Sequence, residues 1–168
     1  EDYDQVVELL TESIEDEADV GRKVAQLGKL GDTRRMYLQE NKKALESYSH
    51  ALSLDPLDGT SRSGLRALSL NKELAHAAGE ALASAFRSAG DADGVLELVE
   101  ARLAAAPDDE FRATVLLEAA KLQESRQDLA SALASLCRSF SLVPDESTET
   151  EARRLAEATG DWTKMSDA

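Results

Sequence analysis

The side chains that could form a nucleotide, metal or other cofactor site in this chain do not have the spacing that such sites require. A phosphate-binding loop has four residues between its two glycines, whereas Gly21 and Gly28 have six residues between them. A metal site needs clustered ligands, and the closest approach is His76 with Glu80, a spacing that is common on charged helices. We therefore expect the chain to bind no metal and no cofactor.

The single cysteine, Cys137, is a poor candidate for a catalytic nucleophile. An activated thiol needs a basic partner, and the chain offers His50 and His76 for that role. Cys137 follows Leu136 in an apolar stretch, where a lone thiol acts as a small hydrophobic residue. Paired carboxylates carry no information in a chain with 33 acidic residues. We therefore expect no enzyme activity and no catalytic residue.

The cysteine count and the hydropathy pattern bear on where the chain functions. One cysteine excludes an internal disulfide, which favours a reducing compartment, and we predict a cytoplasmic location. No apolar run approaches the roughly 18 residues that a membrane span requires. We therefore expect a soluble chain with no membrane span.

The charge is strongly negative and unevenly distributed. A formal charge of −14 argues against nucleic-acid binding, because Lys and Arg contacts to phosphate dominate that interaction. Residues 1–19 contain nine acids and no base, whereas residues 20–56 contain seven bases and four acids. The acidic run is interpreted either as a solvated face that gives solubility or as a helix that guides a basic partner.

Apolar periodicity predicts helices along the whole chain, with no strand. Val6, Leu10 and Ile14, for example, recur at the helical spacing. Two glycines, Gly28 and Gly31, predict a bend or break in the second helix, because glycine weakens a helix interior. The nine predicted helices cover residues 3–17, 20–38, 41–54, 58–70, 74–90, 92–105, 109–125, 129–142 and 146–159.

The predicted helices belong to an internal repeat. The stretch 44–56 returns as 132–144, 88 positions later, and the stretch 2–14 returns as 91–103, with an offset of 89. Both copies of the first stretch have a small, a large and a small residue on one face and end in proline, a pattern that predicts close helix packing. The matched residues are Ala44, Tyr48, Ala51 and Pro56 in one copy and Ala132, Leu136, Ser139 and Pro144 in the other. We expect Tyr48 to be buried.

This repeat resembles the second helix of a tetratricopeptide repeat, whose A-x3-F then P signature is matched by Ala44, Tyr48 and Pro56. The resemblance implies an all-α, right-handed superhelical stack of antiparallel helical hairpins, a TPR-like α-solenoid of about nine helices. The first-helix signature is matched in part by the second copy only, so the chain is similar to a divergent member of the family. That signature is W-x2-L-G-x2-Y. Its four defined positions correspond to Gly28, Gly31, Asp32 and Arg35 in the first copy and to Leu116, Ala119, Ala120 and Gln123 in the second.

The repeat starts divide the chain into modules. We predict a single array with module one at about residues 1–89, module two at about 90–159 and the start of module three at 160–168. The extra helix at 58–70 accounts for the greater length of module one. The third start predicts a fragment of a longer protein, with Trp162 partly exposed on an open edge that could mediate self-association.

An array of this kind predicts a non-catalytic scaffold that binds a protein or peptide of unknown identity. The alternative is an accessory or regulatory segment that packs against other domains of a larger enzyme or of a secretion or signalling protein. The carboxylate clamp of chaperone-binding tetratricopeptide domains is not expected, because Asn41 and Asn71 are the chain's two asparagines and both lie near predicted helix ends. Each candidate partner-binding residue is equally consistent with a solvated face. These candidates are Lys23, Gln26, Arg34, Arg35, Arg112, Lys121 and Gln123.

Overall fold

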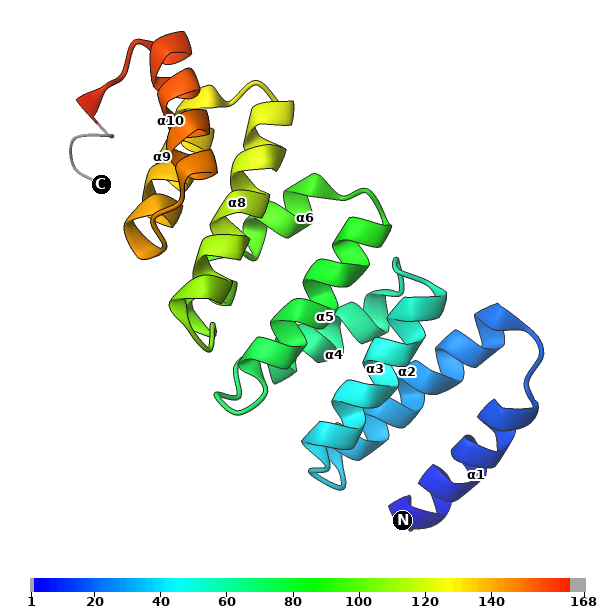
Figure 1. Ribbon diagram of the computed structural model, residues 1–168. Helices are drawn as coiled ribbons and strands as arrows, with labels where there is room; N and C mark the ends of the chain where they lie inside the picture. The colour runs from blue at the N-terminus through cyan, green and yellow to red at the C-terminus, as the bar shows by residue number, and fades with distance from the viewer. Residues whose placement is uncertain (1, 164–168) are drawn as a thin grey trace. The chain divides into compact units, whose positions relative to one another are not determined.

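The computed structural model describes residues 2–163, and its regular structure is entirely α-helical, with ten helices and no strand in that range (Figure 1). The predicted all-α class is therefore confirmed. The chain divides into two compact units, Glu1–Asp91 and Ala92–Ala168. Each unit is considered by itself below.

Unit 1 contains five helices, in which each helix packs against the next. In addition, α2 contacts α4 and α3 contacts α5, so that alternate helices also meet. Aspartate side chains begin three of these helices by accepting a hydrogen bond from a backbone N–H of the first turn. The helices are α1 (Tyr3–Asp16), α2 (Val20–Met36), α3 (Asn41–Leu54), α4 (Gly59–Leu68) and α5 (Ala75–Ser88).

Unit 2 also contains five helices, and aspartates again cap three of them. The long helix α8 packs against α9 and also contacts the two short helices before it, while α10 packs against α9. The helices are α6 (Ala92–Glu97), α7 (Val99–Ala104), α8 (Asp109–Ser125), α9 (Leu129–Leu142) and α10 (Glu146–Thr159). The predicted helices at 41–54, 109–125, 129–142 and 146–159 are confirmed residue for residue.

The single helix predicted over residues 92–105 is wrong, and it is the reason that ten helices replace the expected nine within the described range. The helix is interrupted at Leu98, whose N–H donates to the carbonyl oxygen of Val95 at 3.2 Å, three residues back rather than four. The apolar periodicity continues through this tight turn, because Val95, Leu98, Val99 and Leu103 are all buried. A pattern of buried residues alone could not locate the interruption.

Of the bend or break predicted in the second helix, the break is wrong, because α2 runs without interruption from Val20 to Met36. Its glycine at position 31 has a packing role instead. A Cβ atom at Gly31 would lie 2.5 Å from the ring of Tyr48, and one at Gly64 would lie 2.3 Å from the same ring. The two glycines therefore leave room on α2 and α4 for an aromatic ring that projects from α3.

The repeat positions are buried as predicted. Tyr48, Ala44 and Ala51 have no exposed surface in unit 1, and the matching residues of unit 2 are at most 6% exposed. Trp162 is 53% exposed, which confirms the expectation that its ring is not fully covered. The remainder of the predicted third start, residues 164–168, lies outside the described residues.

Candidate functional site

The predicted partner-binding residues of α2 are largely occupied by contacts within unit 1. The hydroxyl of Tyr48 donates to Asp32 Oδ1 at 2.6 Å, and Arg35 Nε donates to Tyr48 Oη at 3.3 Å. Burial, with the hydrogen bond to Asp32, raises the pKa of Tyr48 to about 12, so the phenol stays neutral. Arg35 therefore holds α2 against α3.

Of the other three candidates of α2, two bond to neighbouring helices. Arg34 Nη1 donates to Ser47 Oγ at 2.9 Å and to the Lys43 carbonyl oxygen at 3.4 Å. Gln26 Nε2 donates to Ser13 Oγ of α1 at 2.8 Å. Lys23 is half-buried. Gln26 and Arg34 therefore connect α2 to α1 and α3 rather than extend freely from the surface.

The candidates of α8 are likewise divided. Arg112 pairs with Asp109 at 2.6 Å, and the amide of Gln123 lies 2.8 Å from Ser135 Oγ of α9. Only Lys121 is exposed, beside an open hollow of about 340 Å³ between α8, α9 and the start of α10. The candidates of α8 therefore form no exposed cluster within unit 2.

A hollow that sequence reasoning missed lies between α1, α2 and α3. It has a volume of about 250 Å³, an apolar floor and a polar rim. The floor residues are Ile14, Leu27 and Leu30, each at most 7% exposed. Within the described residues α1 and α3 both contact α2 but do not contact each other, so α2 forms the base of the hollow. Its full lining consists of Thr11, Ile14, Glu15, Leu27, Leu30, Arg34, Glu46, Ser47 and His50.

A second hollow lies between α7, α8 and α9 in unit 2, with a volume of about 560 Å³. Here α8 forms the base, and α7 and α9 have no direct packing contact in the described part of the unit. The lining consists of Glu100, Leu103, Ala104, Arg112, Leu116, Arg138, Ser141 and Leu142.

The two hollows occupy matching places in the internal repeat. With the offset of 89, Thr11, Ile14 and Glu15 correspond to Glu100, Leu103 and Ala104, and with the offset of 88, His50 corresponds to Arg138. Each hollow therefore has the first repeat helix as one wall and the third as the other. Extending the two sequence offsets to polar positions would have found this pairing from the sequence.

The two hollows differ in the charges on their walls. In unit 2, Arg138 Nη1 donates to Glu100 Oε1 at 2.7 Å and joins α9 to α7. This hydrogen bond lowers the pKa of Glu100 from its ordinary value. In unit 1 the matching residues are Thr11 and His50, and the neutral threonine cannot form an ion pair. The unit 1 hollow therefore lacks the connection that spans its counterpart.

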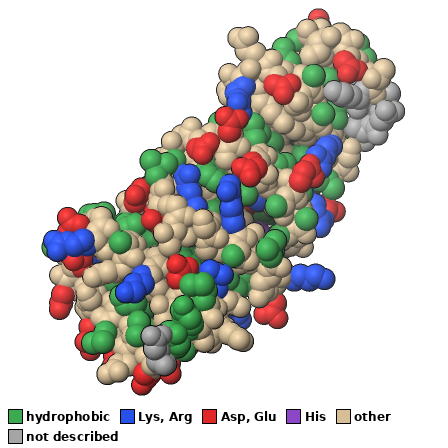
Figure 2. Space-filling model, turned by 180° about the vertical axis from the view of Figure 1, so that it is seen from behind, with side chains coloured by type: hydrophobic (Ala, Val, Ile, Leu, Met, Phe, Trp, Pro, Cys, Tyr) green, Lys and Arg blue, Asp and Glu red, His purple; other side chains and the backbone are tan. Residues whose placement is uncertain are grey.

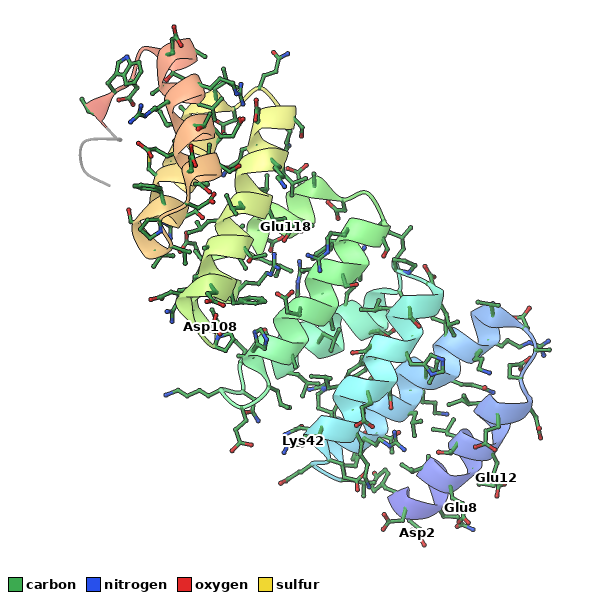
Figure 3. All side chains as sticks on the ribbon, viewed as in Figure 1. Asp2, Glu8, Glu12, Lys42, Asp108 and Glu118 are labelled. Carbon is green, nitrogen blue, oxygen red and sulfur yellow. The ribbon has the colours of Figure 1, made fainter. Side chains whose placement is uncertain are left out.

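Another hollow, of about 370 Å³, is lined by both Asn41 and Asn71, although each lies near a helix end. Its polar groups are partly satisfied within the chain: Lys43 pairs with Glu40, and Asn71 Oδ1 accepts from the backbone N–H of Glu73 at 3.0 Å. The exposed Lys42, labelled in Figure 3, lies on the same rim. Nothing in this arrangement singles it out as a binding site.

The described residues offer no arrangement for metal or thiol chemistry. Residues 2–163 contain no group of three or more His, Cys, Asp and Glu side chains that could hold a metal ion. Cys137 is buried on α9. Across the same residues, no helix has both the length and the apolar character of a membrane span.

Comparison with known proteins adds no family to this geometry. Neither a scan against protein-family models nor a search of curated proteins found a match. The two repeated hollows and the charges around them are therefore the features that bear on function.

Proposed function

We propose that this chain is a non-catalytic scaffold that binds a protein or peptide, built from a right-handed stack of helical hairpins similar to tetratricopeptide repeats. The stacking is supported in unit 1 by the contacts of α2 with α4 and of α3 with α5, which are the contacts that successive hairpins make. The match of Ala44, Tyr48 and Pro56 to the second-helix signature supports the family resemblance.

One observation carries the binding role: a hollow with an apolar floor occurs at the same repeat position in both units. Apolar surface that stays accessible in a concavity between helices suits the side chains of a partner. The chemistry of the walls differs between the units, which allows the two hollows to select different segments.

The charge distribution favours protein over nucleic acid as the partner. The chain has 33 acidic and 19 basic residues. On the face that Figure 2 shows, lysine and arginine side chains are interspersed with acids rather than gathered in a continuous basic stripe. A phosphate backbone would therefore meet repulsion over much of the surface.

A selection of displayed random peptides on the whole chain tests the scaffold role. We expect enrichment of a small set of related peptides, and we expect their binding to shift the NMR resonances of residues that line one of the hollows. Failure to enrich any peptide above a denatured-chain control would contradict the scaffold role.

A further inference from the structure

We propose that the hollow between α1 and α3 in unit 1 is the docking site for a basic amphipathic helix of a partner protein. This inference rests on the proposed scaffold function and specifies the chemistry of the partner at one site. This hollow is called the α1–α3 groove; it is lined by Thr11, Ile14, Glu15, Leu27, Leu30, Arg34, Glu46, Ser47 and His50.

The floor of the α1–α3 groove selects an apolar side chain. Ile14, Leu27 and Leu30 belong to the buried core of unit 1, yet they also line the hollow, so an inserted aliphatic group would extend that core. The volume of about 250 Å³ is below the roughly 300 Å³ at which small-molecule pockets begin. The groove therefore suits an anchoring side chain of a larger partner better than a free metabolite.

The rim of the groove selects positive charge. Glu15 of α1 and Glu46 of α3 stand on opposite walls, both are exposed, and neither forms an ion pair within residues 2–163. Arg34 is the one arginine in the lining, and it already donates to Ser47 and to a backbone carbonyl. The wall helix α1 carries acids and no base. Among the charged residues that line the hollow, two acids stand against one arginine, so its rim is net negative.

An unsatisfied polar atom marks the base of the same hollow. Arg34 Nε is buried and has no hydrogen-bond acceptor. A buried donor of this kind is normally satisfied, and a backbone carbonyl at the carboxyl end of a docked helix would supply the acceptor once the Arg34 side chain turns toward the hollow. Residues 2–91 contain no strand to which an extended peptide could add. A helix that lies along the hollow and inserts one apolar side chain is therefore the binding mode that fits.

The corresponding hollow in unit 2 has the opposite character. Arg112 and Arg138 line it, and Glu100, its one acid, is paired with Arg138. A basic helix would meet two arginines there, each already paired with a carboxylate, and would have to displace those two ion pairs. We therefore expect the basic helix to bind in unit 1 and not in unit 2.

The test uses the full chain and a fluorescein-labelled helical peptide of leucine and lysine, about 18 residues long, with the leucines on one face. Fluorescence anisotropy should show binding that weakens as salt is added. Two matched peptides control for the two requirements: glutamate in place of lysine, and alanine in place of leucine. Both should bind at least about tenfold more weakly, a difference of about 1.4 kcal/mol. Equal affinity of either control peptide would overturn the proposal.

Two double variants locate the site on the protein. Glu15→Lys with Glu46→Lys reverses both rim charges and should weaken binding of the lysine peptide at least about tenfold. Glu8→Lys with Glu12→Lys makes the same total charge change at two exposed residues of α1 that do not line the groove (Figure 3), and should weaken binding less than about threefold. Equal losses in the two variants would show a diffuse attraction to acidic α1 and contradict a site in the groove.

A third variant tests the groove without changing the net charge. Thr11→Glu with His50→Arg introduces the pair that Glu100 and Arg138 form in unit 2. If that pair joins α1 to α3, the peptide should lose at least about fivefold in affinity while circular dichroism stays unchanged. Unchanged affinity in a folded variant whose ion pair is demonstrated by NMR would overturn the proposal.

The outcomes separate this inference from the scaffold role itself. If random-peptide selection enriches binders that are acidic, or that shift resonances of unit 2, the scaffold role stands and the basic-helix site falls. If no peptide of any composition binds, both fall together.

Discussion

Tyr48 is the residue on which the packing of unit 1 most depends. Its ring lies within van der Waals contact of two glycine positions on different helices, and its hydroxyl donates to Asp32. A buried phenol with a hydrogen-bond partner combines apolar contact with a satisfied polar group. The residue therefore fixes α2, α3 and α4 relative to one another.

The tight fit around this ring predicts a loss of stability when one glycine gains a methyl group. Gly64→Ala places a Cβ 2.3 Å from the ring, and we expect it to destabilise the protein by about 2 kcal/mol. Gly59→Ala is the control, because nothing lies within 4 Å of the new Cβ and alanine favours the helix. Urea unfolding should separate the two variants. Equal stabilities would show that the ring can move aside.

The raised pKa of Tyr48 predicts alkaline sensitivity. Its folded value of about 12 exceeds the ordinary 10.0, so the neutral phenol contributes stability that is complete below pH 10 and is lost as pH rises through about 12. We expect this loss to be on the order of 2 kcal/mol and to be absent in Tyr48→Phe. Urea unfolding of both proteins at several alkaline pH values measures the difference. Parallel pH profiles would contradict the assignment.

At the scale of the helices, aspartate caps explain why the boundaries were predictable. Six of the ten helices begin at an aspartate whose side chain accepts a backbone N–H of the first turn. Gly90 and Gly160 end α5 and α10 with positive φ. These are local effects of residue type, so the sequence alone carries them.

Asp58 offers a test of one such cap. Its Oδ2 accepts from the backbone N–H of Ser61 at 2.7 Å at the start of α4. Asp58→Ala should cost on the order of 1 kcal/mol, whereas Asp58→Asn should cost less than half as much, because asparagine caps equally well. Chemical denaturation of the three proteins gives the comparison. Equal losses would mean that the negative charge, rather than the hydrogen bond, stabilises the helix start.

The features that could not be predicted depend on contacts between helices. Gly31 resembled a helix breaker, but its role is set by the ring of Tyr48, 17 residues later in the sequence. The interruption at Leu98 leaves the apolar periodicity intact. The candidate site residues were chosen because they are polar, yet Arg34 and Arg35 bond to α3. The α1–α3 groove became visible only once the three helices were placed together.

At the scale of the whole chain, the net charge of −14 at pH 7 dominates solution behaviour. Like charges keep molecules apart, and this repulsion disappears near the isoelectric point of about 4.5. We predict minimal solubility near that pH, with recovery as the pH returns to neutral. Turbidity measured over a pH series checks it, with circular dichroism to separate association from unfolding. A clear solution at the isoelectric point would show that charge is not what keeps the chains apart.

The two glycines beside the Tyr48 ring, Gly31 and Gly64, also constrain which substitutions unit 1 can accept. At the offset of 88, Gly31 corresponds to Ala119 and Tyr48 to Leu136, so the larger ring occurs with glycine and the smaller side chain with alanine. In unit 1, Gly31→Ala alone would overfill the space beside the Tyr48 ring, and Tyr48→Leu alone would leave a cavity. The effects of substitutions at these two positions are therefore not additive. Gly31→Ala with Tyr48→Leu should lower the free energy of unfolding by less than the sum of the two single substitutions. Making the cavity first and adding the methyl group second avoids the overfilled intermediate, although the first step also removes the hydrogen bond from Tyr48 to Asp32.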